Sequence, residues 1–250
     1  MIIIKTEREV EMMRRAGIKL ARLLDEIIPG LIKPGVSAAY VEQKVNEYMD
    51  KEKCIPSFKG YGGFPYATCM SLNEEIVHGF ALDTKIFKDG DIISVDCGVT
   101  LEGYVADSAR TYLVGNVSED IKKLVKVTEE SLYEGIKAVK PGNRIGDIGY
   151  AVESYVKPYG YGVIRDYVGH GVGRKLHEDP QIPNYGTPGK GPVMRKNMTL
   201  AIEPMISLGD YRVEILEDNW TAVTLDKSPA AHFEHTVLVT DNGAEIITKL

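Results

Sequence analysis

The sequence predicts a mixed α/β (α+β) fold made of two similar halves. Two helical patterns followed by several strand patterns occur twice along the chain. The tripeptide Lys-Pro-Gly at residues 33–35 recurs at 140–142, and at the same offset of 107 residues the segment 87–96 lies over 194–203. Two matches at one shared offset indicate an internal repeat. Its halves would pack their apolar sheet faces together, with a site between them.

A capping box opens the first predicted helix. Thr6 and Glu9 have the required spacing, and apolar residues then recur at helical intervals to about Ile28. A second helix is predicted from about Ser37. Its apolar face carries Val41, Val45 and Tyr48.

Apolar and β-branched segments predict the strands of both halves, and two further helices open the second half. The first-half strands are expected at residues 67–72, 91–99 and 104–114. The second-half helices are expected at residues 118–139 and 145–156, and its strands at 199–203, 211–216, 220–225 and 235–240. No tract rich in Ser, Pro and Gly separates the halves. We therefore predict one domain over residues 1–250, with halves of about 1–115 and 116–250.

The composition is that of a soluble globular protein, with 44% apolar and 26% charged residues. The net charge of −6 argues against a dedicated nucleic-acid-binding protein. Three widely spaced cysteines without a Cys-x-x-Cys pair fit a reduced, cytoplasmic protein. Charged residues follow Met1–Ile4 at once, so we expect neither a signal peptide nor a membrane span.

Two aspartates, Asp96 and Asp107, lie in adjoining strand patterns separated by a break at Leu101–Glu102. A turn centred on that break places the two aspartates directly opposite each other, with Cβ atoms about 4.5–5.5 Å apart. Two ionised carboxylates at that distance need a proton or a cation between them. The pair is therefore either part of a metal site or two exposed aspartates on a solvated face, and the hairpin alone leaves both interpretations open.

Three more residues are candidate ligands. His170 lies in the glycine-rich segment 169–174, Glu203 is held extended by Pro204, and Glu234 lies in the last predicted strand region. Each alone is more often a surface or core-edge residue. With the two aspartates they form an oxygen-rich set with one nitrogen, which suits paired Mn, Fe, Co or Zn ions. Two ions about 3.5–4 Å apart can activate one water for attack on a carbonyl. Because no serine elbow, P-loop or Cys/His nucleophile signature is present, metal-dependent hydrolysis is the leading hypothesis.

Eight short segments carry a resemblance to a known family, and they are 73–79 (NEEIVHG), 91–98 (DIISVDCG), 104–111 (YVADSART), 169–174 (GHGVGR), 177–180 (HEDP), 201–204 (AIEP), 221–224 (TAVT) and 234–236 (EHT). Through these segments the chain resembles the type I methionine aminopeptidases along essentially its whole length. The resemblance implies the pita-bread fold, in which helices of two pseudo-symmetric halves pack on a curved antiparallel sheet.

The resemblance also implies a role for each candidate ligand. Asp96 would bind one of two divalent ions, and His170 and Glu203 would bind the other. Asp107 and Glu234 would bridge the two ions.

Further roles follow from the same resemblance. Glu203 would shuttle the proton of the bridging water, His177 would donate a hydrogen bond to the substrate carbonyl, and His78 would position the scissile amide. Leu176 stands where several family members carry an aromatic residue. The residues that match the methionine side-chain pocket are Tyr61, Phe64, Cys69 and Trp220.

The implied substrates are N-terminal methionyl peptides and nascent chains with a small second residue, with contact to the ribosome. We expect a monomer without a specific nucleic-acid partner. One alternative is a proline-specific peptidase of the same fold, although such relatives usually carry an additional N-terminal domain. The other is a non-catalytic peptide-binding module, although such modules have typically lost ligands that are present here. His232 and His235 have no role in the family pattern, and we interpret both as structural.

Overall fold

Four α-helices form where the sequence predicts them. At the first, the backbone N–H of Thr6 donates to Glu9 Oε2 (2.9 Å) and that of Glu9 donates to Thr6 Oγ1 (3.3 Å), which completes the capping box. Ser37 and Ser118 cap the second and third helices through their side-chain oxygens alone, which accept from the backbone N–H groups of Tyr40 and Ile121. The helices are α1 (Glu7–Arg22), α2 (Ala38–Glu52), α3 (Glu119–Lys137) and α4 (Ile145–Val156). None of them combines the length and apolar character that crossing a membrane requires.

Helix α1 does not end as a regular α-helix. It continues through a π-helical turn, Leu23–Ile27, and a 3₁₀ turn, Ile28–Gly30. Pro29 lacks a backbone N–H and ends the helical run, which is close to the predicted end near Ile28. Two other 3₁₀ turns lie at Tyr61–Gly63 and Lys157–Tyr159.

Fifteen strands form four sheets, and every pairing is antiparallel. The strands of the first half are β1 (Ile55–Pro56), β2 (Thr68–Leu72), β3 (Glu75–Val77), β4 (Ile92–Leu101) and β5 (Tyr104–Leu113). Those of the second half are β6 (Gly162–Val163), β7 (Gly169–Gly171), β8 (Glu178–Ile182), β9 (Thr199–Ile202), β10 (Met205–Ser207), β11 (Val213–Ile215), β12 (Ala222–Thr224), β13 (Ala230–His232), β14 (His235–Val239) and β15 (Ala244–Ile246). The predicted strands are all present. Most of the others have only two or three residues, too few to show a pattern.

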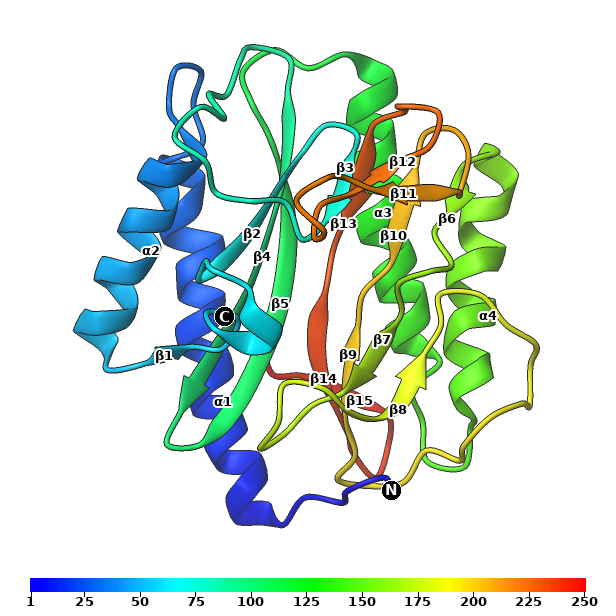
Figure 1. Cartoon of the computed structure of the whole chain (residues 1–250). Helices are drawn as coiled ribbons and strands as arrows, with labels where there is room; N and C mark the ends of the chain where they lie inside the picture. Colours follow the sequence, from blue (N-terminus) through cyan, green and yellow to red (C-terminus); the bar gives the residue numbers. More distant parts are fainter.

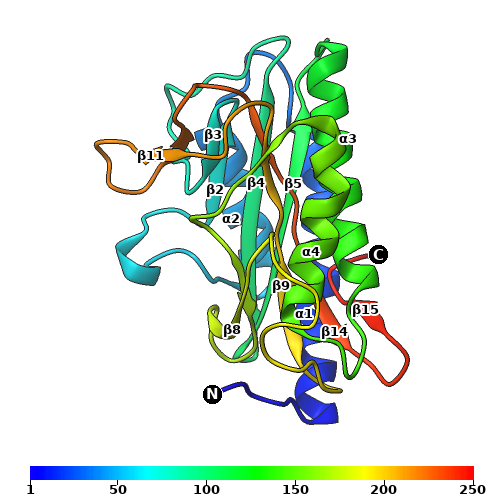
Figure 2. The same cartoon turned by 90° about the vertical axis from the view of Figure 1, so that its right-hand side faces the viewer.

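The structure, a computed structural model that describes residues 1–250, places the helices around a central group of strands. In Figure 1, α1 and α2 lie at the left beside β2, β4 and β5, whereas α3 and α4 lie at the right. Turned by 90°, the molecule shows α1, α3 and α4 on one side of the strands, with β3, β8 and β11 on the other (Figure 2). Helices therefore cover one side of the central strands, and loops and short strands cover the other.

The β4–β5 hairpin corrects the predicted register. Its turn is centred on Glu102 and Gly103, both of which have positive φ (50° and 82°), as a two-residue type I′ turn requires. Asp96 consequently pairs with Ala109, and Asp107 pairs with Gly98. The predicted direct opposition of the two aspartates is wrong by two residues. Because a shift of two residues keeps the side-chain alternation, both carboxylates still lie on one face, as diagonal neighbours.

The structural elements recur at the offset found in the sequence. Helix α2 begins at residue 38 and α4 at 145, β1 at 55 and β6 at 162, and β4 at 92 and β9 at 199. Two isolated bridges, Ser37 with Ile86 and Arg144 with Val193, are separated by the same 107 residues. The internal repeat is therefore visible in the backbone as well as in the sequence.

Two hydrophobic clusters of similar size lie under the two helix pairs. One has 23 buried residues, mainly from α1, α2, β2 and β4, and the other has 22, mainly from α3, α4, β9 and β14. A third cluster of 12 residues includes Met13 and Phe64 from the first half and Val172 and Ala201 from the second. This third cluster joins the halves beside the candidate site.

Candidate active site

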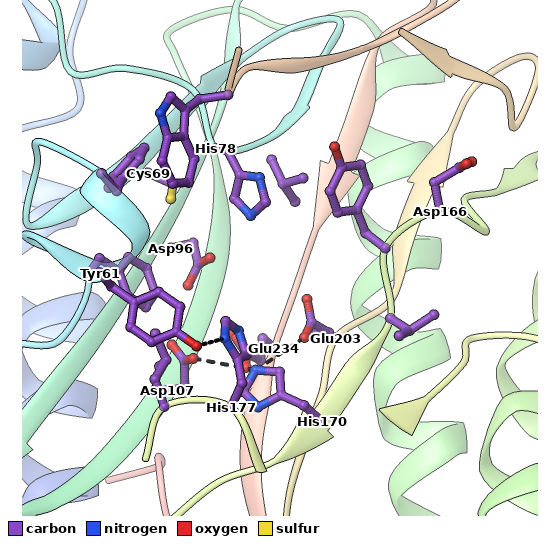
Figure 3. A pocket seen from close by; sticks show the side chains of 17 residues that line it. Tyr61, Cys69, His78, Asp96, Asp107, Asp166, His170, His177, Glu203 and Glu234 are labelled. Atoms are coloured by element: carbon purple, nitrogen blue, oxygen red, sulfur yellow. Dashed lines mark hydrogen bonds and ion pairs between the residues drawn. The ribbon is translucent and has the colours of Figure 1, made fainter. Parts of the chain in front are cut away.

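A cavity of about 340 Å³ contains all of the predicted ligand residues, and both halves of the chain contribute to its lining. Figure 3 shows Asp96, Asp107, His170, Glu203 and Glu234 pointing toward one common space. The ligand atoms of Asp107, His170 and Glu234 lie within 4.8 Å of one another. The fold thus brings together five side chains that are widely separated in the sequence.

Strand pairing explains how each ligand reaches this space. Asp96 and Asp107 come from the β4–β5 hairpin, and His170 comes from β7, where it pairs with Ala201 of β9. Glu203 directly follows β9, two residues beyond Ala201 and therefore on the same face as His170. Glu234 lies in the short gap between β13 and β14.

The backbone of Glu234 is bound to the hairpin. Its N–H donates to the carbonyl of Ala109 (3.0 Å), and its own carbonyl accepts from the side chains of Ser108 (2.5 Å) and Arg110 (2.9 Å). Two residues further on, the hydroxyl of Thr236 donates to the carbonyl of Asp107 (2.8 Å). These bonds fix the spacing between the two bridging candidates, Asp107 and Glu234.

The tautomer of His170 can be derived from its hydrogen bond. Its Nδ1 lies 2.9 Å from the carbonyl oxygen of Gly171, and because a carbonyl only accepts, Nδ1 carries the proton. The lone pair of Nε2 therefore faces Asp107 Oδ2 at 3.7 Å and Glu203 Oε1 at 3.6 Å. Three electron-rich atoms facing one another form a suitable arrangement for a cation, and a carbonyl that fixes the distal ring nitrogen is typical of metal-ligating histidines.

The carboxylates of the site carry perturbed pKa values. Burial, opposed by the nearby His232 and reinforced by Glu203, raises the pKa of Asp96 to about 7, and burial raises that of Glu203 to about 8. The pKa values of Asp107 and Glu234 are raised well above normal by burial and by the neighbouring carboxylates. Four carboxylic acids this close together resist ionisation. Divalent cations between them stabilise their ionised forms.

Three carboxylate oxygens of the site, Asp96 Oδ1, Asp107 Oδ1 and Glu234 Oε1, are buried and have no hydrogen-bond partner. Buried polar atoms are nearly always paired, and an ion is one of the ordinary explanations for an exception. The donor set, the unpaired oxygens and the tautomer of His170 together fit bound divalent metal.

Two more predicted histidines line the same cavity. The Nδ1 atom of His177 lies 2.8 Å from the hydroxyl of Tyr61, and its ring stands edge-on to that of His170, 4.3 Å between centroids. His78 has a positive φ of 60° and stands edge-on to Tyr167. Burial lowers the pKa of His78 to about 4 and also lowers that of His177, so both rings are neutral at pH 7.

An apolar pocket adjoins the metal-ligand candidates. Cys69 on β2 pairs directly with Asp96 on β4, which places the pocket next to the carboxylates. Phe64 packs edge-on against Trp220, 5.1 Å between ring centroids. Tyr61, Phe64, Cys69 and Trp220, the predicted pocket residues, all line the cavity. The prediction did not include Phe58, Val77, Asp166, Tyr167 and Val168, which also line it, and Leu176 contributes to the wall.

The two remaining histidines differ in position. His235 points away from the cavity, and its Nδ1 lies 2.9 Å from Thr248 Oγ1. His232, which we interpreted as structural, lies beside the site, with Nε2 3.6 Å from Glu203 Oε2. The sequence feature that points to this placement of His232 is its position two residues before Glu234, on the same side of an extended segment.

Comparisons with known proteins identify the family to which the chain belongs. A model of metallopeptidase family M24 matches residues 11–241. Methionine aminopeptidase 1 of Bacillus subtilis is 51% identical over 250 residues, which is 100% of both chains. The crystal structure of a methionine aminopeptidase from Thermotoga maritima has a TM-score of 0.98 and 57% identity, and covers 100% of both chains. A prolidase from Pyrococcus horikoshii has a TM-score of 0.80 and 25% identity, and this chain covers only 63% of it.

The chain therefore belongs to metallopeptidase family M24, a family of metal-dependent hydrolases with the pita-bread fold. Within that family it stands among the methionine aminopeptidases, which it matches from end to end at up to 57% identity.

Proposed function

We propose that the protein removes the N-terminal methionine from peptides and nascent chains whose second residue is small, with two divalent metal ions in its active site. The observation that carries the proposal is the arrangement of five metal-ligand candidates beside an apolar pocket in one cavity of about 340 Å³. The ligands suit Mn, Fe, Co or Zn ions, and the pocket suits a thioether side chain.

We expect the two ions to share the five ligands unequally. Asp96 would hold one ion, His170 and Glu203 the other, and Asp107 and Glu234 would bridge them. When bound, the ions would supply an activated water and a Lewis acid for the substrate carbonyl.

Glu203 is the best-placed group for proton transfer. Its carboxylate lies beside His170 and opposite the two aspartates, and burial raises its pKa to about 8, near the working pH of a cytoplasmic enzyme. A group with a pKa near the ambient pH can both take a proton and release it. Glu203 would receive the proton of the attacking water and deliver it to the leaving amine.

His177 would stabilise the negative charge that develops on the carbonyl oxygen. For Nε2 to donate a hydrogen bond to that oxygen, Nδ1 must be an acceptor. The hydroxyl of Tyr61, 2.8 Å away, can donate to Nδ1 and so fix this tautomer. His78, held beside Tyr167 and Trp220, would position the scissile amide.

The methionine side chain would fill the pocket formed by Tyr61, Phe64, Cys69 and Trp220. Phe64 and Cys69 are buried, and burial, together with the nearby Asp96 and Asp107, raises the pKa of the Cys69 thiol well above normal. The thiol is therefore a neutral, polarisable wall rather than a nucleophile.

A peptide panel tests the proposal. The protein is dialysed against a chelator, reloaded with Mn, Fe, Co or Zn, and assayed with Met-Ala-Ser, Met-Leu-Ser, Ala-Ala-Ser and Ala-Pro-Ser. We expect metal-dependent cleavage of Met-Ala-Ser alone. Preferential cleavage of Ala-Pro-Ser would favour a proline-specific peptidase, and complete inactivity with every metal would favour a binding module. We also expect a monomeric cytoplasmic protein that works near the ribosome, which size-exclusion chromatography and ribosome co-sedimentation can check.

A further inference from the structure

The carboxylate of Glu203 lies between two imidazole rings. Its Oε1 is 3.6 Å from His170 Nε2, and its Oε2 is 3.6 Å from His232 Nε2. The first ring belongs to the candidate metal ligands, whereas the second has no role in the proposed chemistry. Each oxygen of Glu203 is therefore associated with a different ring.

His232 is unusual among the buried histidines of this chain. Only 1% of it is exposed, and neither ring nitrogen has a hydrogen-bond partner. The buried rings of His170 and His235 each bind a protein oxygen through Nδ1. A buried donor without a partner costs about 1–3 kcal/mol, so a ring in this position requires an explanation.

The backbone of His232 is rigidly held, so the position of its ring is defined. Its N–H donates to Thr111 Oγ1 (2.9 Å), and its carbonyl accepts from the same hydroxyl (2.8 Å). Thr111 is hydrogen-bonded in turn to Ser94 on β4, and His232 pairs with Met205 of β10, two residues beyond Glu203. The backbone that carries the ring is thus bound to β5, to which β4 with Asp96 is paired, and to β10, which begins two residues after Glu203.

The charged and titratable groups that influence His232 are Asp96, Glu203 and His78. Burial lowers the pKa of His232 against the opposing effect of Asp96. A neutral imidazole has one N–H donor and one acceptor nitrogen. A carboxylate can only be satisfied by the donor.

We propose that His232 is a positioning residue whose Nε2–H donates a hydrogen bond to Oε2 of Glu203 and leaves Oε1 directed toward His170. The distance of 3.6 Å is a few tenths of an ångström beyond a normal hydrogen bond, and catalytic hydrogen bonds are often long before ligands are bound. A carboxylate held in this way keeps one oxygen oriented for the reaction. The inference rests on the proposed role of Glu203 in proton transfer.

Two variants separate this role from a purely structural one. His232→Gln keeps an N–H donor on a side chain of similar reach, whereas His232→Leu keeps the bulk and removes the donor. We measure kcat and KM for Met-Ala-Ser, the number of Mn²⁺ ions bound by calorimetry, and the melting temperature. We expect His232→Leu to lower kcat by about 10–100-fold, with KM and Mn²⁺ stoichiometry unchanged, and His232→Gln to stay within a few-fold of the parent.

A second measurement does not depend on activity or on the folding of a variant. In the parent protein loaded with diamagnetic Zn²⁺, in which Glu203 is ionised and can only accept, ¹⁵N chemical shifts of the histidine rings report the tautomer of His232, which is assigned by the signal missing from His232→Gln. A proton on Nε2 supports the proposal, and a proton on Nδ1 overturns it. Unchanged kcat in a folded His232→Leu variant would also overturn it, as would loss of one Mn²⁺ ion, which would make His232 a ligand. A parent that cleaves no methionyl peptide would instead refute the proposed function. The tautomer measurement needs no turnover, so the two failures can be distinguished.

Discussion

Glu203 directly follows a strand, and its carboxylate has an imidazole on each side and carboxylates opposite. Strands β4, β5, β7 and β13 all place groups around it. Its chemistry should therefore be separable from its structural contribution by a substitution that keeps the shape and removes the charge.

The first prediction concerns Glu203→Gln. The variant should fold and bind at least one Mn²⁺ ion, but its kcat for Met-Ala-Ser should fall by about 10²–10⁴-fold, because an amide cannot accept the proton. Stopped assays and calorimetry measure the two quantities. The exposed Glu217→Gln variant serves as the control and should be indistinguishable from the parent. Activity of Glu203→Gln within tenfold of the parent would refute the assigned role.

The second prediction concerns Tyr61→Phe. It keeps the aromatic wall of the pocket but removes the hydroxyl 2.8 Å from His177 Nδ1. Because the tautomer of His177 is then no longer fixed, kcat should fall by about tenfold while KM changes little. Steady-state kinetics with Met-Ala-Ser give both constants. A change confined to KM would instead assign the hydroxyl to substrate binding.

At the residue scale, the sequence predicted candidates better than it predicted contacts. His170, Glu203 and Glu234 are each ambiguous alone, and only their combination with Asp96 and Asp107 indicated a metal site. His232 has no role in the family pattern, and its neighbours in space, Glu203 and Asp96, are distant in the sequence. A contact that crosses from β13 to the end of β9 leaves no local pattern.

At the scale of elements, the β4–β5 hairpin shows how turn chemistry decides the register. The apolar pattern predicts a break at Leu101–Glu102, but the turn needs two residues with positive φ, and glycine, here Gly103, adopts this conformation most readily. The long helices and strands were predictable because they repeat an apolar pattern. Strands such as β1 and β6 were not, because two residues take their structure from the strand with which they pair.

The third prediction concerns the packing of α1. Gly17→Ala would normally stabilise a helix by about 1 kcal/mol. Here the added methyl group would overlap the backbone carbonyl of Ile247, so we expect a lower melting temperature and destabilisation by at least about 1–3 kcal/mol. Chemical denaturation measures the difference. Gly30→Ala, whose methyl group would meet no atom within 4 Å, is the matched control and should be nearly neutral.

At the scale of the whole molecule, the repeat was predictable and the assembly of the site was not. The offset of 107 residues relates α2 to α4 and β4 to β9, so the sequence contained the symmetry. The orientation of Glu234 could not be predicted from the sequence, because it depends on hydrogen bonds from Ser108 and Arg110 across the boundary between the halves.

The fourth prediction concerns pH and metal removal. Burial raises the pKa of Asp96 from 3.8 to about 7 and that of Glu203 from 4.5 to about 8. At a pH between the pKa of the unfolded chain and the pKa of the folded protein, the unfolded chain has lost these protons while the folded metal-free protein retains them. The folded state therefore binds more protons, and its stability falls as pH rises from about 4 to about 8.

Melting temperatures of chelator-treated protein at pH 5, 6, 7 and 8 check this direction. Added Mn²⁺ should raise the melting temperature most at pH 8, because the ions bind the ionised carboxylates. The matched control is Glu203→Gln, whose metal-free form should lose less stability between pH 6 and 8. A metal-free parent that becomes more stable over that interval would contradict the predicted linkage.

The bonds between Glu234 and the β4–β5 hairpin have a mechanical consequence. Asp107 and Glu234 are separated by more than half of the chain, and each belongs to a different half. An ion bridging them would act as a reversible cross-link that closes this long loop, much as a disulfide does, and would restrict the movement of one half against the other. Metal supply in the cell would then set the rigidity of the molecule together with its activity.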